Sequence, residues 1–385
     1  MYTILAPAQL HMGPGSLSAL KGIVGGYETG RVLIVTDEGI RTSGILDQVL
    51  KAGELSSTRL DIFDGVQSNP EIPLLEACGE RVAAGGYALI IGLGGGSPLD
   101  VAKASSLLPA NGGKMRPILG RGMIKNQGVP LCLIPTTSGT GSEVTQAVVT
   151  GDPEKQTKVS IWDPHVVPRF AVIDPTLTVG MPPRLTADTG LDAVTHAVEA
   201  YTVRTTNPVA RLYAGEALQL AVRHLAKAVH DGSNMEARAG MSLAATFAGL
   251  AFSNAGLGAI HAFCLPLESR KHIPHGRSVA IVSPWIVDFN RVGNEETFAA
   301  LAGFLGEDIS QSDAAAASKK ASAGLRRLME SVGVSPCLLD HGIQSGEVDN
   351  LAKEAFLVGQ RLLPFNAREM TEKDAIEIFR TAAGR

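Results

Sequence analysis

The stretch ALIIGLGGGSPLDVAKASSLL, residues 88–108, decides the fold class. It begins as a buried strand, turns at three glycines (94–96) and continues as a helix that Ser97 and Pro98 open. Glycine lets the backbone approach a phosphate closely, proline suits a first helical turn, and the helix N-terminus offers free N–H groups and a positive dipole end. The turn therefore predicts either a phosphate site or a plain tight turn, and it is not the GxGxxG pattern.

The sequence around this unit repeats the same alternation of strand and helix. RVLIVTD (31–37) and TRLDIF (58–63) are typical of strands, the first of them buried on both faces. Helical segments are expected at 44–53 and 71–86. We therefore expect a parallel sheet covered on both faces, with ligands at the carboxyl ends of its strands and the glycine turn after the third strand.

A second loop, IPTTSGTGSEVT (134–145), follows another apolar strand, PLCLIP (130–135). Its hydroxyl groups can donate hydrogen bonds to phosphate and ribose oxygens, although the same composition also suits a polar surface turn. Two phosphate-type loops on one sheet favour a dinucleotide over a lone phosphate.

The strand pattern largely stops after FAVIDPTLT (170–178), and long helical stretches such as 207–231 and 313–333 follow. A chain of 385 residues also exceeds the usual size of one domain. We predict two domains: an α/β dinucleotide-binding domain over 1–178 and an all-helical, metal-binding catalytic domain over 179–385.

Composition excludes several classes of protein. The net charge is −4, with lysine and arginine scattered among the acids, so no basic face for nucleic acid is expected. No apolar run approaches the roughly 18 residues needed to span a bilayer. The four cysteines form no CxxC pair and no leader segment is evident, which favours reduced thiols and a cytoplasmic protein.

The segment LTADTGLDAVTHAVEAYT (185–202) places Asp192 and His196 four residues apart, on one face of a helix. A carboxylate and an imidazole in this arrangement can share a divalent cation. Alternatively, the two side chains hydrogen-bond only to each other on a partly buried helix.

The segment GAIHAFCLPLESRKHIPHG (258–276) supplies His261 and His275, with His272 between them. Joined to the pair on the earlier helix, these two histidines complete a set of one carboxylate and three imidazoles, which suits Zn²⁺ or Fe²⁺ rather than Ca²⁺. An open coordination position would let the metal act as a Lewis acid on a substrate oxygen. For His272 we expect a place at the rim or beside the ligands rather than ligation.

The chain resembles the iron-containing (group III) alcohol dehydrogenases from end to end. The motifs that carry the resemblance are, in order, LHMGPGSLSAL, VTD, SNPE, GGGSPLDVAK, PTTSGTGSEVT, TKVSIWDPHVVPRFAVIDPTLT, GLDAVTHAVEAY, HAFCLPLESRKHIPHG and FNAREMT. Singly several of these are weak, but in this order they are highly specific.

The resemblance implies the dehydroquinate synthase-like/group III alcohol dehydrogenase fold. This fold combines an α/β N-terminal Rossmann-like nucleotide-binding domain with an all-α C-terminal domain and has its active site in the cleft between them. Fe²⁺, or alternatively Zn²⁺, would be held by four catalytic residues: Asp192, His196, His261 and His275. The pyrophosphate of NAD would lie on Gly94, Gly95, Gly96 and Ser97, with Asp100 in the same motif. Asp37 would face the adenosine ribose, and Asn69 would lie near the adenosine portion. The rest of the cofactor would be flanked by Thr136, Thr137, Thr140 and Lys158.

The chain departs from the family pattern at two places in the motif HAFCLPLESRKHIPHG, after His261. Many members carry a histidine four residues after this ligand, near the nicotinamide, where this chain has Leu265. The glycine-rich continuation common after PLG is replaced by Leu267, Glu268 and Ser269. A proton relay through position 265 is therefore excluded, and the substrate pocket is where the resemblance is least informative.

We therefore expect an oxidoreductase that interconverts a small primary alcohol or diol with its aldehyde or ketone by hydride transfer to NAD, as a homodimer or higher homo-oligomer without nucleic-acid or membrane partners. One alternative is a metal-free enzyme like maleylacetate reductase, against which the complete ligand set argues. A lyase like dehydroquinate synthase would have extra basic residues for a phosphorylated substrate, and none can be picked out. A non-enzymatic nucleotide sensor would usually have lost a ligand or a phosphate loop.

Overall fold

The computed structural model describes residues 2–55, 59–155 and 157–384. The chain divides into two compact units. The first is Leu5–Gly180, and the second takes the described residues from Met181 onward together with residues 2–4. The sequence placed the boundary after residue 178.

The first unit is built on a six-stranded sheet in which every paired strand is parallel. Its order is β1-β9-β6-β4-β2-β3. The strands are β1 (Gln9–Met12), β2 (Arg31–Val35), β3 (Leu60–Phe63), β4 (Tyr87–Gly94), β6 (Leu131–Pro135) and β9 (Phe170–Ile173). Thr58, the first residue of one predicted strand, lies outside the described residues.

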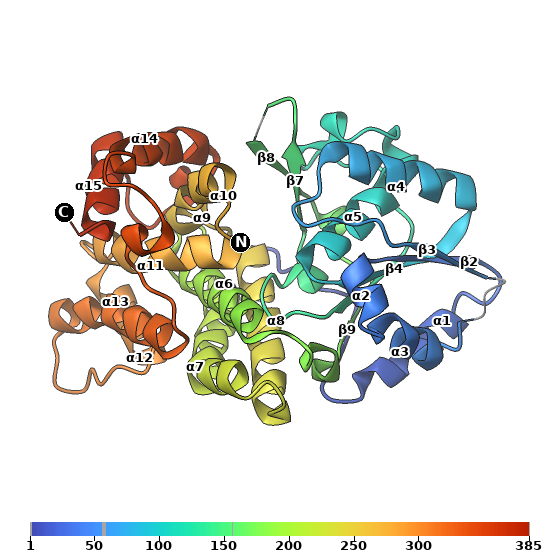
Figure 1. Cartoon of the computed structure of the whole chain (residues 1–385), viewed down its shortest axis with the longest axis horizontal. Coiled ribbons are helices and arrows are strands. Elements are labelled where there is room, and N and C mark those ends of the chain that lie inside the picture. Colours follow the sequence, from blue (N-terminus) through green and yellow to red (C-terminus); the bar gives the residue numbers. More distant parts are fainter. Residues whose placement is uncertain (1, 56–58, 156, 385) are drawn as a thin grey trace. The chain divides into compact units, whose positions relative to one another are not determined.

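Helices cover both faces of this sheet (Figure 1), as the near-continuous apolar strands predict. Alternate residues of β4 explain why: Ile90 packs with α4 and α5, whereas Leu89 and Ile91 pack with α1 and α3. The helices of this unit are α1 (Leu20–Gly25), α2 (Glu38–Thr42), α3 (Ile45–Ala52), α4 (Ile72–Gly85) and α5 (Gly96–Leu107).

Two features of the first unit were not predicted. The short strand β1 precedes the others, so the strand before the glycine turn is the fourth in the chain and not the third as expected. A second sheet of three strands, in the order β5-β8-β7, contains β5 (Gly120–Arg121), β7 (Ala147–Asp152) and β8 (Thr157–Trp162). β1 and β5 are short, β7 is partly buried but mixes apolar with polar residues, and β8 is mostly half-exposed, so none has the continuous buried apolar pattern of the main strands.

Between β2 and β4 the chain reverses the direction in which it adds strands to the sheet. From β2 the chain continues outward to β3 and then returns to the other side of β2 with β4, and the following strands β6 and β9 continue in that direction. Ligands of open parallel sheets bind outside the carboxyl ends of the strands at such a switch point. The glycine turn follows β4, so it lies at this position.

The second unit contains ten α-helices in its described residues and no strand. Within it α6, α7 and α8 pack on one another, and α11 packs on α6. The helices are α6 (Pro183–Thr202), α7 (Pro208–His230), α8 (Met235–Ala255), α9 (Ala259–Phe263), α10 (Leu265–Lys271), α11 (His275–Asn290), α12 (Glu295–Phe304), α13 (Ala314–Ser331), α14 (Val348–Val358) and α15 (Glu372–Ala382). The predicted fold class, an α/β unit followed by an all-helical unit, is confirmed.

No single helix of the described residues is long and apolar enough to cross a membrane. Helix α8 and the segment Ala259–Lys271 reach that length and composition only as a pair, with a bend of 97° between them.

Candidate metal centre and nucleotide-binding edge

Helix α6 positions the first two predicted ligands. Asp192 and His196 lie one turn apart on its buried face, with side chains 3% and 6% exposed. The nearest atoms, Asp192 Oδ1 and His196 Nδ1, are 3.7 Å apart, which is too far for a hydrogen bond between them. The alternative of a simple Asp–His hydrogen bond is therefore not what the structure contains.

The other two predicted ligands come to the same point from later in the chain. His261 lies in α9 and His275 is the first residue of α11. Their Nε2 atoms lie 3.9 Å and 3.5 Å from Asp192 Oδ1. One potential ligand atom from each of the four residues lies within 4.8 Å of the other three, and all four belong to the helical unit.

The geometry of this cluster fits a cation. Metal–ligand bonds of about 2.1 Å in a tetrahedron place neighbouring ligand atoms about 3.4 Å apart. The observed distances to Asp192 Oδ1 are close to this value, and His261 Nε2 and Asp192 Oδ1 are both buried. Neither atom has a hydrogen-bond partner in the part of the chain that the structure describes. Buried polar atoms are normally paired, so a group that binds both is expected here.

A glycine explains how α11 comes so close to α6. A Cβ at Gly276 would lie 2.0 Å from the carbonyl oxygen of Asp188, one turn before Asp192 on α6. Only glycine permits this backbone contact. Next to it, Arg277 Nε donates to Asp188 Oδ1 at 2.8 Å and fixes the start of α11 on α6. His275 is thereby held beside Asp192.

Two carboxylates that the sequence reasoning did not assign to the site contact the ligand histidines. Glu199 Oε2 lies 2.6 Å from His261 Nδ1, and Glu268 Oε1 lies 2.7 Å from His275 Nδ1. A carboxylate that holds Nδ1–H leaves Nε2 as the ligand atom of the ring. Glu199 follows His196 by three residues on the same helix face, and this spacing was a usable signal. No comparable signal existed for Glu268.

His272 is exposed and ends α10 in the left-handed conformation, with φ of 54°. Its position outside the groups of described residues that can hold a metal ion agrees with the expectation that it is not a ligand.

In the α/β unit, Asp37 and Gly94 meet at the switch point of the sheet. Asp37 caps α2, and its Oδ1 accepts from the backbone N–H of Ile40 at 2.9 Å. The other carboxylate oxygen, Oδ2, faces Gly94, and a Cβ added to that glycine would lie 3.3 Å from it. Asn69, exposed and with φ of 53°, lies in the segment that follows β3. Asp37 and Asn69 follow the neighbouring strands β2 and β3, and Gly94 is the last residue of β4.

The glycine turn lies against the hydroxyl-rich loop. A Cβ at Gly95 would stand 3.4 Å from Thr137, and one at Gly96 would stand only 2.8 Å from Thr140. The backbone N–H of Thr136 donates to the carbonyl of Gly94 at 2.9 Å. Helix α5 begins at Gly96 without a side-chain cap, so Ser97 and its neighbours in the first turn present N–H groups that no side chain caps.

Asp100 and Lys103 of α5 bind the loop that follows β6 and so hold it against the helix that the glycine turn opens. Asp100 Oδ1 accepts from Ser142 Oγ at 2.6 Å and its Oδ2 from the N–H of Val149 at 2.9 Å. Burial raises the pKa of Asp100, while the charges of Lys103 and Lys158 act to lower it. Both carboxylate oxygens of Asp100 are thus engaged within the protein. The position of Lys158 on β8 is near enough for its charge to act on Asp100.

Lys103 was not identified from the sequence. It is fully buried, and its Nζ donates to Ser142 Oγ, Thr145 Oγ1 and the carbonyl of Ala147 at 2.9–3.1 Å. Burial lowers its pKa to about 8, against the opposing charges of Asp100 and Glu143. This lysine ties α5 to the loop that follows β6.

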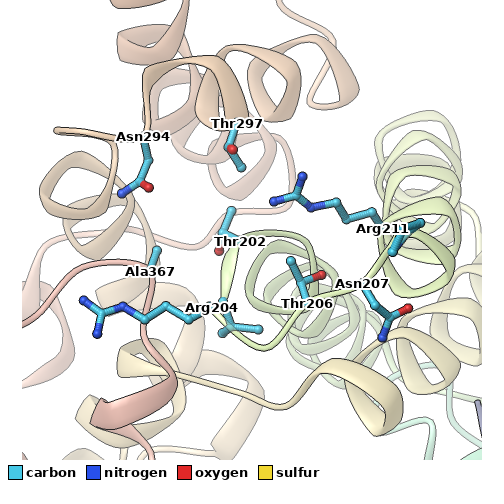
Figure 2. A pocket seen from close by; sticks show the side chains of 10 residues that line it. Thr202, Arg204, Thr206, Asn207, Arg211, Asn294, Thr297 and Ala367 are labelled. Atoms are coloured by element: carbon cyan, nitrogen blue, oxygen red, sulfur yellow. The ribbon is translucent and has the colours of Figure 1, made fainter. Parts of the chain in front are cut away.

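A separate polar cavity of about 340 Å³ lies elsewhere in the helical unit (Figure 2). It is lined among others by Arg204, Arg211, Thr206 and Asn294. None of its lining residues belongs to the metal cluster, and its only lining residue on α6, Thr202, is ten residues and therefore about 15 Å beyond Asp192 along that helix. The cavity is therefore distinct from the metal cluster.

The chain matches two family models in succession. Residues 7–175 match the iron-containing alcohol dehydrogenase model, and residues 186–383 match the model of the C-terminal part of the same family. The chain is 34% identical to the 1,3-propanediol dehydrogenase of Klebsiella pneumoniae over 387 residues, which cover 99% of each protein. The chain belongs to the iron-containing alcohol dehydrogenase family.

Other members agree with this assignment. The NAD-dependent methanol dehydrogenase of Bacillus methanolicus is 33% identical and covers 91% of this chain, which in turn covers 92% of that enzyme. The structure of an alcohol dehydrogenase from Oenococcus oeni is 31% identical, with a TM-score of 0.94 over 99% of this chain and 100% of the other. The predicted family and enzyme class are confirmed. A 1,3-propanediol dehydrogenase and a methanol dehydrogenase differ by one percentage point in their identity to this chain, so the family alone does not give the substrate.

Proposed function

We propose that this iron-containing alcohol dehydrogenase homologue is a metal-dependent, NAD-linked enzyme that interconverts a small primary alcohol or diol with its aldehyde or ketone. The observation that carries the proposal is the buried cluster of Asp192, His196, His261 and His275, in which the atoms Asp192 Oδ1 and His261 Nε2 converge without hydrogen-bond partners among the described residues. We propose these four residues as the ligands of Fe²⁺, or alternatively Zn²⁺. The bound cation would supply Lewis acidity toward the substrate oxygen.

The α/β unit would hold the dinucleotide. The first turn of α5 offers N–H groups to a pyrophosphate over Gly94 to Ser97, as at other helix N-termini that bind phosphates. Thr136, Thr137 and Thr140 stand beside this turn and can donate hydroxyl hydrogen bonds. Asp100 would act indirectly, because both of its oxygens hold the loop rather than face outward.

Asp37 is proposed to select NAD. It follows β2 and caps α2 at the switch point, where a carboxylate accepts hydrogen bonds from the ribose hydroxyls and repels a 2′-phosphate. Asn69 follows the adjacent strand, near the proposed adenosine side, and Lys158 is assigned to the remainder of the cofactor by the family motif alone.

Leu265 removes one route for the proton. Hydride transfer from an alcohol leaves a proton to be lost to solvent, and a leucine at the first position of α10 cannot carry it. The proton would therefore leave through water or through the ribose hydroxyls of the cofactor. An apolar wall at this position also favours substrates with some apolar surface.

The test is a panel of alcohols and aldehydes on Fe²⁺- and Zn²⁺-loaded protein, followed by NADH absorbance. His275→Ala should remove most bound metal and nearly all turnover while NAD affinity stays within a few-fold, because the proposed nucleotide loops belong to the other unit. Full activity of metal-free protein would contradict the proposal and would favour a metal-independent reductase.

A further inference from the structure

Glu268 is a residue in which this chain departs from its family, and the structure places it beside a proposed metal ligand. It lies in α10, at a place where the family resemblance implies a glycine-rich segment. Its side chain is only 8% exposed. One of its oxygens, Oε1, lies 2.7 Å from His275 Nδ1 and accepts from Cys264 Sγ at 3.1 Å.

His275 is the ligand with the greatest need of a positioning partner. Its side chain is 35% exposed, whereas the other three are between 3% and 7% exposed. It is also the first residue of α11 and follows a sharp turn in which His272 has a positive φ and Pro274 is extended. The ring is therefore not enclosed by its surroundings, and its rotamer depends on a side-chain contact.

The contact with Glu268 fixes which nitrogen faces the metal. A carboxylate accepts hydrogen bonds but does not donate them, so His275 Nδ1 carries the proton and Nε2 keeps its lone pair. That Nε2 is the atom 3.5 Å from Asp192 Oδ1. Glu199 makes the same contact with Nδ1 of His261 and likewise leaves its Nε2 free to face the metal. Carboxylates in this position orient metal-binding histidines and make them more basic.

We propose that Glu268 is a positioning residue for His275 and that it sets how tightly and how long the metal is held. This inference rests on the proposed metal-dependent function and deepens it. It gives this chain two carboxylate–histidine pairs at one metal, Glu199–His261 from α6 and α9 and Glu268–His275 from α10 and α11. The second pair closes the turn at 272–274 and ties α11 back to α10.

The same atoms offer one competing arrangement. Cys264, Glu268 and His275 also lie close enough together to surround a cation of their own. That site would require His275 Nδ1 as a ligand and Glu268 as a second one, so Glu268 would bind metal directly. The two arrangements differ in stoichiometry: one metal ion per chain if Glu268 positions His275, and two if it is itself a ligand.

The experiment compares full-length wild-type protein with E268A and E268Q. Glu347→Gln is the matched control, because Glu347 also pairs with α10, through Lys271 Nζ at 2.7 Å, without contact to His275. Affinity for Zn²⁺ and Co²⁺ is measured by competition with a chromophoric chelator, together with metal content, far-UV circular dichroism and the visible spectrum of the Co²⁺ protein.

We expect one metal ion per chain in the wild type and a ten- to hundredfold loss of affinity in E268A, with an altered Co²⁺ spectrum. In E268Q the amide oxygen still accepts from Nδ1–H, so the spectrum should stay near that of the wild type while affinity falls less than in E268A. If E268A fails to fold, E268Q decides: reduced affinity supports the inference, and unchanged affinity overturns it.

Three results would count against the inference. Wild-type affinity and spectrum in E268A, or a loss of equal size in E347Q, would show that Glu268 does not position His275. Two metal ions per wild-type chain, with one lost in E268A, would show that Glu268 is a ligand. A wild-type chain that binds no divalent metal would refute the proposed function itself, which separates that failure from a failure of this inference alone.

Discussion

Replacing Glu199 by alanine should both weaken the helical unit and loosen the metal. The carboxylate is almost completely buried and accepts two hydrogen bonds, from the N–H of Ile260 at 2.7 Å and from His261 Nδ1 at 2.6 Å. Both donors belong to buried residues, so the variant leaves two buried N–H groups without their carboxylate partner.

The magnitude follows from these two contacts. A hydrogen bond to a charged group contributes about 1.5–3 kcal/mol, so two give roughly 3–6 kcal/mol. Removing a buried charge recovers part of its desolvation cost, which places the expected loss of unfolding free energy near the lower end, about 3 kcal/mol. The free imidazole of His261 should also turn more easily, which weakens metal binding by about tenfold or more.

Urea unfolding of E199A in excess chelator isolates the folding term, and the same titration with saturating Zn²⁺ adds the metal term. Glu216→Ala is the control, because Glu216 is an exposed glutamate of the same unit. If metal-free E199A unfolds within about 1 kcal/mol of the wild type and binds Zn²⁺ equally well, then neither contact of Glu199 matters as argued.

Three further predictions concern other parts of the chain. Asp37→Gly should raise the use of NADP relative to NAD, measured as the ratio of kcat/KM values, and an unchanged ratio would show that Asp37 is not the selector. Leu265→His should add an ionisation between about pH 6 and 8 to the pH–rate profile and shift preference toward more polar diols, and an unchanged profile and ranking would mean that position 265 does not face the reaction. Burial lowers the pKa of Lys103 to about 8 from 10.5, so at this residue the unfolded chain binds more protons between these values and the residue's contribution to stability should rise with pH from about 8 to 10.5, by up to about 3 kcal/mol. In denaturant titrations the unfolding free energy of the wild type minus that of Lys103→Met should rise by about 2 kcal/mol between about pH 8 and 10, because the raised pKa values of Cys78 and Cys132 act in the opposite sense but are common to both proteins and cancel in the difference; a constant difference would refute this contribution.

Local patterns in the sequence predicted the elements that carry the proposed site. Helical spacing placed Asp192 and His196 on one face, and the strand–turn–helix pattern placed Gly94 to Ser97 at a helix start, because both features depend only on neighbours in sequence. The sequence also predicted that the hydroxyl-rich loop belongs to the same sheet as the glycine turn, and the structure places this loop, after β6, beside the turn.

Contacts between distant segments were beyond such patterns. Lys103 reads as an ordinary helical lysine, and only the folded chain shows that its Nζ is buried between α5 and the loop after β6. The second sheet depends on the antiparallel pairing of β7 with β8, whose residues alternate without an apolar signature. The role of Glu268 depends on a turn that folds α11 back on α10, and its sequence position looked only like a departure from the family.

The cost of the metal cluster is itself an argument for its function. Asp192 and Glu199 are buried, and in the described structure their only ion-pair partners are histidines. Burying carboxylates is expensive unless positive charge compensates them, and apolar residues of similar size would usually serve stability better. With Glu268 the cluster contains three carboxylates around three imidazoles. A divalent cation beside Asp192 Oδ1 would compensate the charge of Asp192 directly. It would also polarise the rings of His261 and His275, which would strengthen their hydrogen bonds to Glu199 and Glu268. A protein that needed only a stable core between α6, α9 and α11 would have no physical reason to retain this arrangement.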